Sequence, residues 1–244
     1  MTKWVVKGLK TGIKTTGYPG IHETAEGVSP GRPGVSGIEG TEDFKSIAES
    51  CPADALTSTK DGISLEQRRC IDCFRCSRLA QNRITRDDGY EWADFTAAGK
   101  PLGPAFTRSV HIRIVDAGAC AACLSEIKLM ASPYYNVHRL GLFITPTPRM
   151  ADVLMVAGPL TEHMRLSLEK TFEAMPTPKV VIAVGTCALS GGVFGPSFAA
   201  QGGIGKTMPV DVEIPGCPPP PLAIIHGLLL ASGKFRKQKD GGAL

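Results

Sequence analysis

The sequence predicts an α/β protein in which a parallel β-sheet is covered by helices on both faces and is preceded by a small cysteine-rich segment. Five short runs rich in Val and Ile are each closed by Gly, Pro or Asp: VHIRIVDAG, LGLFITP, DVLMVAGP, KVVIAVGT and VDVEIPG. Continuous apolar runs of this length are typical of strands buried on both faces. Several of them are separated by stretches of helical length, such as LTEHMRLSLEKTFEAM, which would cover the sheet.

Composition divides the chain into five parts. Residues 1–40 are rich in Gly, Pro, Ser and Thr and lack helical or strand periodicity, which predicts an extended arm that is either disordered or laid on a partner subunit. A small cysteine-bearing segment, a polar linker, the sheet domain and a short tail follow, with bounds at 41–85, 86–108, 109–235 and 236–244. A length of 244 residues suits one large domain with a smaller one.

Charge and hydropathy argue against several classes of function. The 27 Lys and Arg residues exceed the 23 Asp and Glu residues by 4 without forming a basic block, which disfavours binding to nucleic acid or to a membrane surface. The amino-terminal apolar run is too short for a signal peptide, so we expect the chain to remain inside the cell. The longest apolar stretch, LAIIHGLLLA, is half the length of the ~20 residues that cross a bilayer, so membrane association is expected only through partner subunits.

Eight cysteines in a reducing compartment favour metal binding over disulfide bonds. The first four are Cys70, Cys73 and Cys76, at CxxCxxC spacing, and Cys51, which precedes a proline. In two-cluster ferredoxins each run is CxxCxxCxxxCP, and the cysteine before the proline ligates the other cluster. Cys51 therefore completes one 4Fe-4S site with the CxxCxxC triplet.

The ligands of the other ferredoxin cluster are missing as a complete set. Counting from Cys51 and Cys76 at the same spacing places those ligands at Thr41, Phe44, Ile47 and Ala80, none of which is cysteine. Segment 41–85 therefore resembles a ferredoxin, with a small α+β fold, reduced to a single cluster. A four-thiolate zinc site is the alternative, although zinc ribbons usually pair two CxxC knuckles.

The second four cysteines follow the predicted strands. Cys120 and Cys123 come after VHIRIVDAG, Cys187 after KVVIAVG, and Cys217 after VDVEI. Because the carboxyl ends of parallel strands open into one crevice, these thiols are expected to converge despite their separation in the sequence. Glycines flank the cysteines in all three loops and would let the backbone N–H groups approach bound sulfur; they are Gly118, Gly185, Gly191, Gly192 and Gly216.

The segment from Ser109 to Gly233 resembles the small electron-transfer subunit of group 4 nickel-iron hydrogenases, as in formate hydrogenlyase. The resemblance rests on GACAACLSEI, PRMADVLMVAGPLT, PKVVIAVGTCALSGGVFG and VDVEIPGCPPPP. The homologous subunit of respiratory complex I has tandem cysteines where this chain has Cys120 and Cys123 at CxxC spacing, which favours the hydrogenase. A complex I-like or nickel-free redox module is the alternative.

This resemblance implies a flavodoxin-like domain that holds a 4Fe-4S cluster on Cys120, Cys123, Cys187 and Cys217. With the ferredoxin-like segment, two 4Fe-4S clusters are expected to relay electrons between a large nickel-iron subunit and ferredoxin-type subunits. The same resemblance implies membrane subunits as further members of the complex, no nucleic acid, and a cytoplasmic location that includes the cytoplasmic face of the membrane. The chain itself lacks a nickel site, a GxGxxG motif and a P-loop, so the reaction is expected on a partner chain.

Two further residues match positions of the family motif. Glu126 lies three residues after Cys123, where the negative charge of a cluster would raise the pKa of its carboxyl and couple proton uptake to reduction. The alternative is an ordinary carboxylate in the first turn of a helix. Arg139 is expected either to raise the cluster potential by its charge or to form a surface salt bridge. His111 and His226 are expected to be structural.

Overall fold

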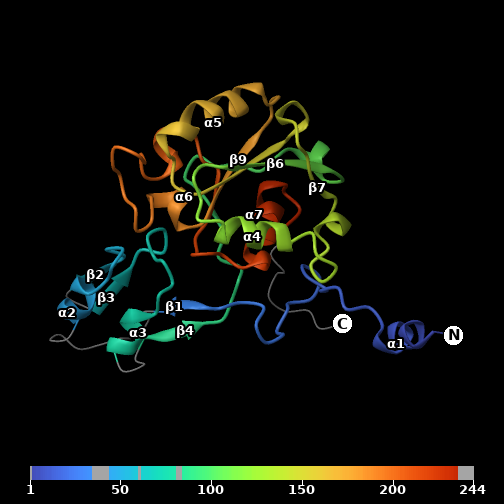
Figure 1. Cartoon of the computed structure of the whole chain (residues 1–244), viewed down its shortest axis with the longest axis horizontal. Coiled ribbons are helices and arrows are strands. Elements are labelled where there is room, and N and C mark those ends of the chain that lie inside the picture. The colour runs from blue at the N-terminus through green and yellow to red at the C-terminus, as the bar shows by residue number, and fades with distance from the viewer. Residues whose placement is uncertain (1, 35–43, 60–61, 81–83, 236–244) are drawn as a thin grey trace.

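The computed structural model describes residues 2–34, 44–59, 62–80 and 84–235, in which a six-stranded sheet forms the larger part (Figure 1). Its strands lie in the order β5-β10-β9-β8-β6-β7. Five of them are parallel: β6 (Val110–Asp116), β7 (Leu142–Ile144), β8 (Val153–Ala157), β9 (Val180–Val184) and β10 (Val212–Ile214). Numbered along the chain, these five lie in the order 2-1-3-4-5, which is the flavodoxin-like order that the sequence predicted.

The central strands are buried on both faces, as their apolar runs predicted. In β8, Val153 and Met155 face a core covered by α4 (Ala122–Leu129) and α7 (Pro221–Ala231). Leu154 and Val156 face the opposite core, which is covered by α5 (Glu162–Ala174) and α6 (Thr186–Ser190). Side chains alternate between these faces because successive residues of a strand point in opposite directions. The sheet is therefore the middle layer of three (Figure 1).

The last helix, α7, carries the longest apolar stretch of the chain. It begins at Pro221 within the run of four prolines, in keeping with the tolerance of proline in a first helical turn. All of its residues except Leu230 are buried, which explains why it is apolar all round. Within the described ranges, no helix combines the length and the hydropathy needed to cross a bilayer.

The small domain has the element order β-α-β-β-α-β of a ferredoxin-like fold. Its elements are β1 (Arg32–Gly34), α2 (Phe44–Glu49), β2 (Leu56–Thr59), β3 (Gly62–Leu65), α3 (Arg75–Leu79) and β4 (Thr85–Asp87). Strand β1 pairs antiparallel with β4, and β2 pairs antiparallel with β3. The domain thus includes a strand at residue 32, inside the segment that was expected to be an arm.

Apolar residues occupy the places of the missing ferredoxin ligands. Ile47 is 4% exposed and Ala80 is 0% exposed, and both pack in one cluster with Leu56, Ile63 and Ile84. A compact apolar core therefore stands where a second cluster would bind. Thr41 and the side chain of Phe44 lie outside the described residues.

Beyond α1 (Lys3–Thr11), the amino-terminal segment that was expected to be an extended arm packs on its own chain. After this helix, the backbone N–H of Thr16 donates to the carbonyl of Tyr134 at 2.9 Å. Tyr18 is 1% exposed and meets the ring of Tyr90 edge-on at 5.2 Å. This packing depends on contacts between residues far apart in sequence, which composition cannot reveal.

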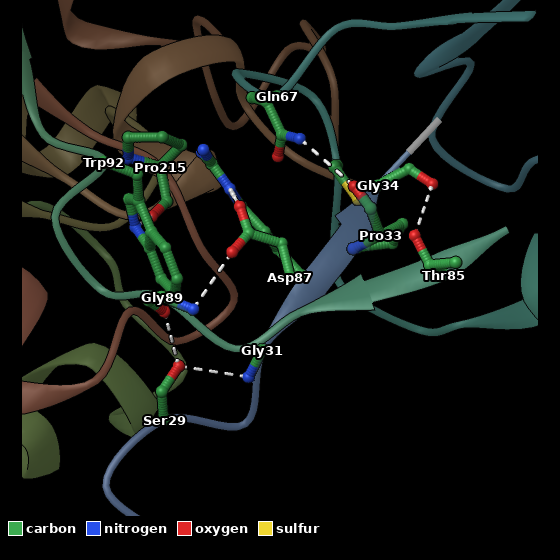
Figure 2. Close-up of polar contacts among 12 residues, drawn as sticks. Ser29, Gly31, Pro33, Gly34, Gln67, Thr85, Asp87, Gly89, Trp92 and Pro215 are labelled. Carbon is green, nitrogen blue, oxygen red and sulfur yellow. Dashed lines mark hydrogen bonds and ion pairs between the residues drawn. The ribbon is translucent and has the colours of Figure 1, made fainter. Parts of the chain in front are cut away.

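The segment expected to be a linker is built into the sheet domain. It contributes β5 (Asp94–Phe95), which extends the sheet antiparallel to β10. Its Trp92 is 9% exposed and donates from Nε1 to the carbonyl of Pro215 at 2.8 Å, directly before the Cys217 loop (Figure 2). Short 3-10 helices complete the described elements: η1 (Pro104–Phe106), η2 (Val137–Leu140), η3 (Pro148–Met150) and η4 (Ile204–Lys206).

Polar contacts tie β1 and the residues just before it to the linker and to the loop that precedes Cys70. Figure 2 shows Ser29 Oγ donating to the carbonyl of Gly89 at 2.8 Å and accepting from the N–H of Gly31 at 3.1 Å. Further along the strand, Gln67 Nε2 donates to the carbonyl of Pro33 at 3.4 Å. Residues 29–34 are therefore tied to both the linker and the loop that precedes Cys70.

Candidate functional site

The first cysteine group surrounds a single cavity in the small domain. Cys51, Cys70, Cys73 and Cys76 all line this cavity, whose remaining wall includes Ala55, Leu56 and Leu65. The turn between the cysteines of the triplet needs left-handed backbone at Asp72 (φ 49°) and Phe74 (φ 54°), after which α3 begins at Arg75. The structure thus brings together the four residues that the ferredoxin spacing selected.

The thiols of this group differ in exposure: Cys70 is buried, Cys51 and Cys76 are partly buried, and Cys73 is exposed. Burial raises the pKa of Cys76, and the charges of Cys73 and Cys51 raise it further. Burial also raises the pKa of Cys70, with the charge of Asp72 as the next cause. The backbone N–H of Ala55 points at Cys51 Sγ from 3.3 Å. Since thiols must lose their protons to bind metal, the raised pKa values of Cys70 and Cys76 favour a ligand whose positive charge offsets the cost of ionising them.

The second cysteine group lies at the carboxyl edge of the sheet, as predicted. Cys120 and Cys123 follow β6 around Ala121, whose φ of 72° lets the chain turn into α4. Cys187 lies in α6 directly after β9, and Cys217 follows β10. Three loops from strands that are not all neighbours therefore converge on one place.

The four thiols of this second group interact electrostatically. Burial raises the pKa of Cys123 to about 12, and the charges of Cys217, Cys187 and Cys120 contribute to the increase. Burial raises the pKa of Cys217 to about 11, with the charge of Cys187 as the next cause. A metal centre of positive charge beside these thiols would lower the pKa values that burial and neighbouring thiolates raise.

Two glycines make room for the sulfurs. A Cβ at Gly185, whose φ is +84°, would lie 2.6 Å from Cys123 Sγ, and a Cβ at Gly192, whose φ is +57°, would lie 2.9 Å from Cys187 Sγ. Any larger residue would displace the thiols. Glycine backbone beside the sulfurs of Cys123 and Cys187 suits an iron-sulfur cluster, which needs one thiolate per iron and benefits from nearby N–H groups.

All eight cysteines are free thiols rather than disulfide partners. In the part of the chain that the structure describes, no three His, Cys, Asp or Glu side chains approach closely enough to form a site for a single metal ion.

Two side chains join the cysteine groups to each other. Thr186 Oγ1 is 2.6 Å from the carbonyl of Cys70 and 3.3 Å from that of Gly216, so one hydroxyl bridges the two loops. From the other side, Asp72 Oδ2 accepts from the N–H of Cys217 at 3.1 Å. We call these two bonds, Thr186 to Cys70 and Cys217 to Asp72, the reciprocal bridge.

Sequence reasoning did not single out Thr186 or Asp72, the two residues whose side chains form the reciprocal bridge. The available signal was their position, since Asp72 lies inside the CxxC of one group and Thr186 directly precedes Cys187 of the other. Nearby, Arg68 Nε pairs with Glu213 Oε2 at 2.9 Å and adds a third contact between the small domain and β10. The two cysteine groups thus meet across a polar interface of named contacts.

The other predicted residues are placed as follows. Glu126 lies in α4, and burial raises the pKa of its carboxyl, in the expected direction. Arg139 donates from Nη2 to the carbonyl of Tyr18, and burial lowers the pKa of its guanidinium. It therefore holds the amino-terminal segment, a contact that neither expectation included. His226 packs edge-on against Phe235 at 4.7 Å, and His111 lies 3.5 Å from Asp152.

Comparison with known proteins identifies the family of the chain. Residues 120–231 match the family described as NADH ubiquinone oxidoreductase, 20 kDa subunit. A probable membrane-bound hydrogenase subunit of Pyrococcus furiosus is 40% identical over 134 residues, which are 55% of this chain and 80% of that protein. The chain belongs to the 20 kDa subunit family.

The 20 kDa-type region contains all four cysteines of the second group, whereas the first group precedes it. An uncharacterised protein of Methanocaldococcus jannaschii is 43% identical over 127 residues, 52% of this chain and 85% of that protein. Formate hydrogenlyase subunit 7 of Escherichia coli is 40% identical over 131 residues, 54% of this chain, and the match spans only 51% of that subunit. The relatives thus resemble the sheet domain of this 20 kDa-type subunit.

Gly185→Ala tests the space around Cys123. The new Cβ is expected to displace the sulfur and to strain the backbone at positive φ, so the anaerobically purified variant should lose iron from the second cysteine group and retain that of the first. Iron analysis and electron paramagnetic resonance (EPR) measure the loss. Gly205→Ala is the matched control because nothing lies within 4 Å of its added Cβ. Unchanged iron in Gly185→Ala would contradict this account of the site.

Proposed function

We propose that this chain is the electron-transfer subunit of a multi-subunit group 4 nickel-iron hydrogenase. In this proposal it relays electrons through two 4Fe-4S clusters between a catalytic large subunit and ferredoxin-type carriers. The observation that carries the proposal is the reciprocal bridge, which sets a loop of one cysteine group against a loop of the other. The family and the names of the hydrogenase relatives support it.

Each cysteine group has a separate task in this proposal. Cys51, Cys70, Cys73 and Cys76 hold the cluster of the small domain, and Cys120, Cys123, Cys187 and Cys217 hold the cluster of the sheet domain. A 4Fe-4S cluster accepts and releases one electron at a time. Gly185 and Gly192 leave room for the sulfurs of Cys123 and Cys187 in the second group, and Ala55, Leu56 and Leu65 form an apolar wall beside the first.

The catalytic nickel-iron site belongs, in this proposal, to the large subunit. Cys120 and Cys217 are exposed, so the second cysteine group has an open side on which that subunit would lie. Ferredoxin-type subunits would approach the small domain, and membrane subunits would join through the complex at the cytoplasmic face, as the name of the Pyrococcus relative suggests. A complex I-like or nickel-free redox module is the second candidate, favoured by the family to which the chain belongs.

Metal content distinguishes these candidates. The native assembly, isolated anaerobically through a tag on this chain, is expected to contain nickel and to supply about eight iron atoms for this subunit. The difference in iron content between the assembly with and without the tagged chain gives the iron that this chain binds. Iron without nickel would favour the second candidate, and zinc in place of iron would refute electron transfer by this chain.

Thr186→Val tests the reciprocal bridge. The change keeps the shape of the side chain but leaves the buried carbonyl of Cys70 without its donor, at an expected cost of about 1–3 kcal/mol in the free energy of unfolding. The magnetic interaction between the two reduced clusters, seen by EPR, should weaken because the loops are no longer held together. Thr186→Ser, which retains the hydroxyl, is the matched control. Equal EPR spectra for Val and Ser variants would contradict a role for this bond.

Glu126→Gln tests proton coupling. Burial already raises the pKa of the carboxyl, and an electron added nearby would raise it again, so reduction would draw a proton onto Glu126. Between its two pKa values, the cluster potential should therefore fall as pH rises, by at most roughly 59 mV per pH unit. Glu126→Gln should remove this slope, and the exposed Glu173→Gln should not. A slope that survives Glu126→Gln would refute the coupling.

A further inference from the structure

Helix α1 has an apolar side and a basic side. Its sequence is KWVVKGLKT, in which Lys3, Lys7 and Lys10 recur at the i, i+4 and i+7 positions of one side. Trp4, Val5, Val6 and Leu9 occupy the remaining circumference. A helix with one apolar side and one basic side is expected to lie at a boundary, with its apolar side against an apolar surface and its lysines in water or beside anionic groups.

The apolar side of α1 is left largely uncovered by the residues that the structure describes. Trp4 and Leu9 are each 75% exposed, and Ile13, just beyond the helix, is 91% exposed. None of the residues of α1, all of which the structure describes, is buried. In Figure 1 the helix stands apart from both domains, at the end of the molecule opposite the β2-β3 hairpin. Large apolar side chains gathered on one exposed helix indicate an interaction surface.

The net charge of the chain is concentrated in this segment. Lys3, Lys7, Lys10 and Lys14 are the only charged side chains before Glu23, and their four charges equal the net charge of +4, so the remaining residues sum to zero. The four lysines of the amino-terminal segment thus account for the whole excess of basic over acidic residues. Its partner must accept both apolar side chains and positive charge.

We propose that α1 docks on the surface of a bilayer that contains anionic lipids. Lysines on one side and Trp4 on the other suit the boundary between headgroups and acyl chains, where tryptophan rings favour the interface and lysine ammonium groups reach the phosphates. An acidic groove on a protein would satisfy the lysines but would have to match the apolar side in shape as well. The bilayer satisfies both sides without a matched surface.

The attachment of α1 to the body suits such docking. Gly12, at a φ of 66°, ends the helix, and the next fixed points are Thr15, whose Oγ1 donates to the carbonyl of Pro133 at 2.9 Å, and Thr16. Only residues 12–14 lie between the helix and this anchored backbone. Docking of α1 would therefore hold the sheet domain close to the membrane, independently of the electron transfer proposed above and in contrast to an association through partners alone.

The test uses the full chain, purified anaerobically with its iron, and vesicles of phosphatidylcholine with or without phosphatidylglycerol. Co-sedimentation is expected only with phosphatidylglycerol, and salt should weaken it. Lys7→Glu combined with Lys10→Glu should reduce binding roughly tenfold or more. Trp4→Ser combined with Leu9→Ser should abolish it, together with the blue shift of tryptophan fluorescence that accompanies binding.

Matched control variants carry the same types of substitution at exposed positions outside α1. Lys45→Glu with Lys170→Glu alters exposed lysines outside α1, and Leu166→Ser with Phe198→Ser alters side chains that are 60% and 100% exposed. Both controls should bind as the unchanged chain does, and unchanged visible absorption shows that each variant is folded. Equal binding to both vesicle types, binding that survives the α1 substitutions, or association of α1 only with an acidic partner subunit would overturn the proposal.

Discussion

The contact between the Cys70 loop and the Cys217 loop is the constraint on which the arrangement of the two cysteine groups depends. Thr186 is 1% exposed, so its hydroxyl must find protein acceptors, and it finds one in each loop. The carboxylate of Asp72 accepts a hydrogen bond from the N–H of Cys217, and burial raises the pKa of this carboxyl. In both bonds the sheet domain donates and the Cys70 loop accepts, so rotation of one domain against the other would break the buried bond of Thr186 and the exposed bond of Asp72.

The segment between the domains makes this contact possible. Trp92 binds the carbonyl of Pro215, two residues before Cys217, and the guanidinium of Arg32 lies over the same ring at 5.0 Å. Arg68 reaches Glu213 in β10, so the strand that leads to Cys217 is held from the side of the small domain as well. The position of Cys217 thus depends on residues of three segments, and those that link the domains contribute to it as directly as the strands do.

The sequence predicted the parts of this arrangement that depend on local pattern. Buried runs such as VVIAV indicate parallel strands, and their carboxyl ends located Cys187 and Cys217 correctly. What escaped prediction depends on long-range contacts. Strand β1 contains Pro33 and Gly34, which are poor strand formers, and exists because β4 pairs with it. Tyr18 is buried only because Tyr90 lies against it, and Thr186 gains its role only once Cys70 is beside it.

In the small domain, buried apolar side chains stand at two of the positions where the ferredoxin spacing would place further ligands. Buried thiols without metal repel one another once ionised, so a decaying cluster site is costly if only some ligands disappear. Here Ile47 and Ala80 fill the region with apolar contacts that need no cofactor. The remaining cysteine group is the one that faces the Cys217 loop. Under the proposed function, this domain can receive or deliver electrons only through the cysteine group that adjoins the sheet domain. Any ferredoxin-type carrier must then dock near Cys73, the exposed member of that group.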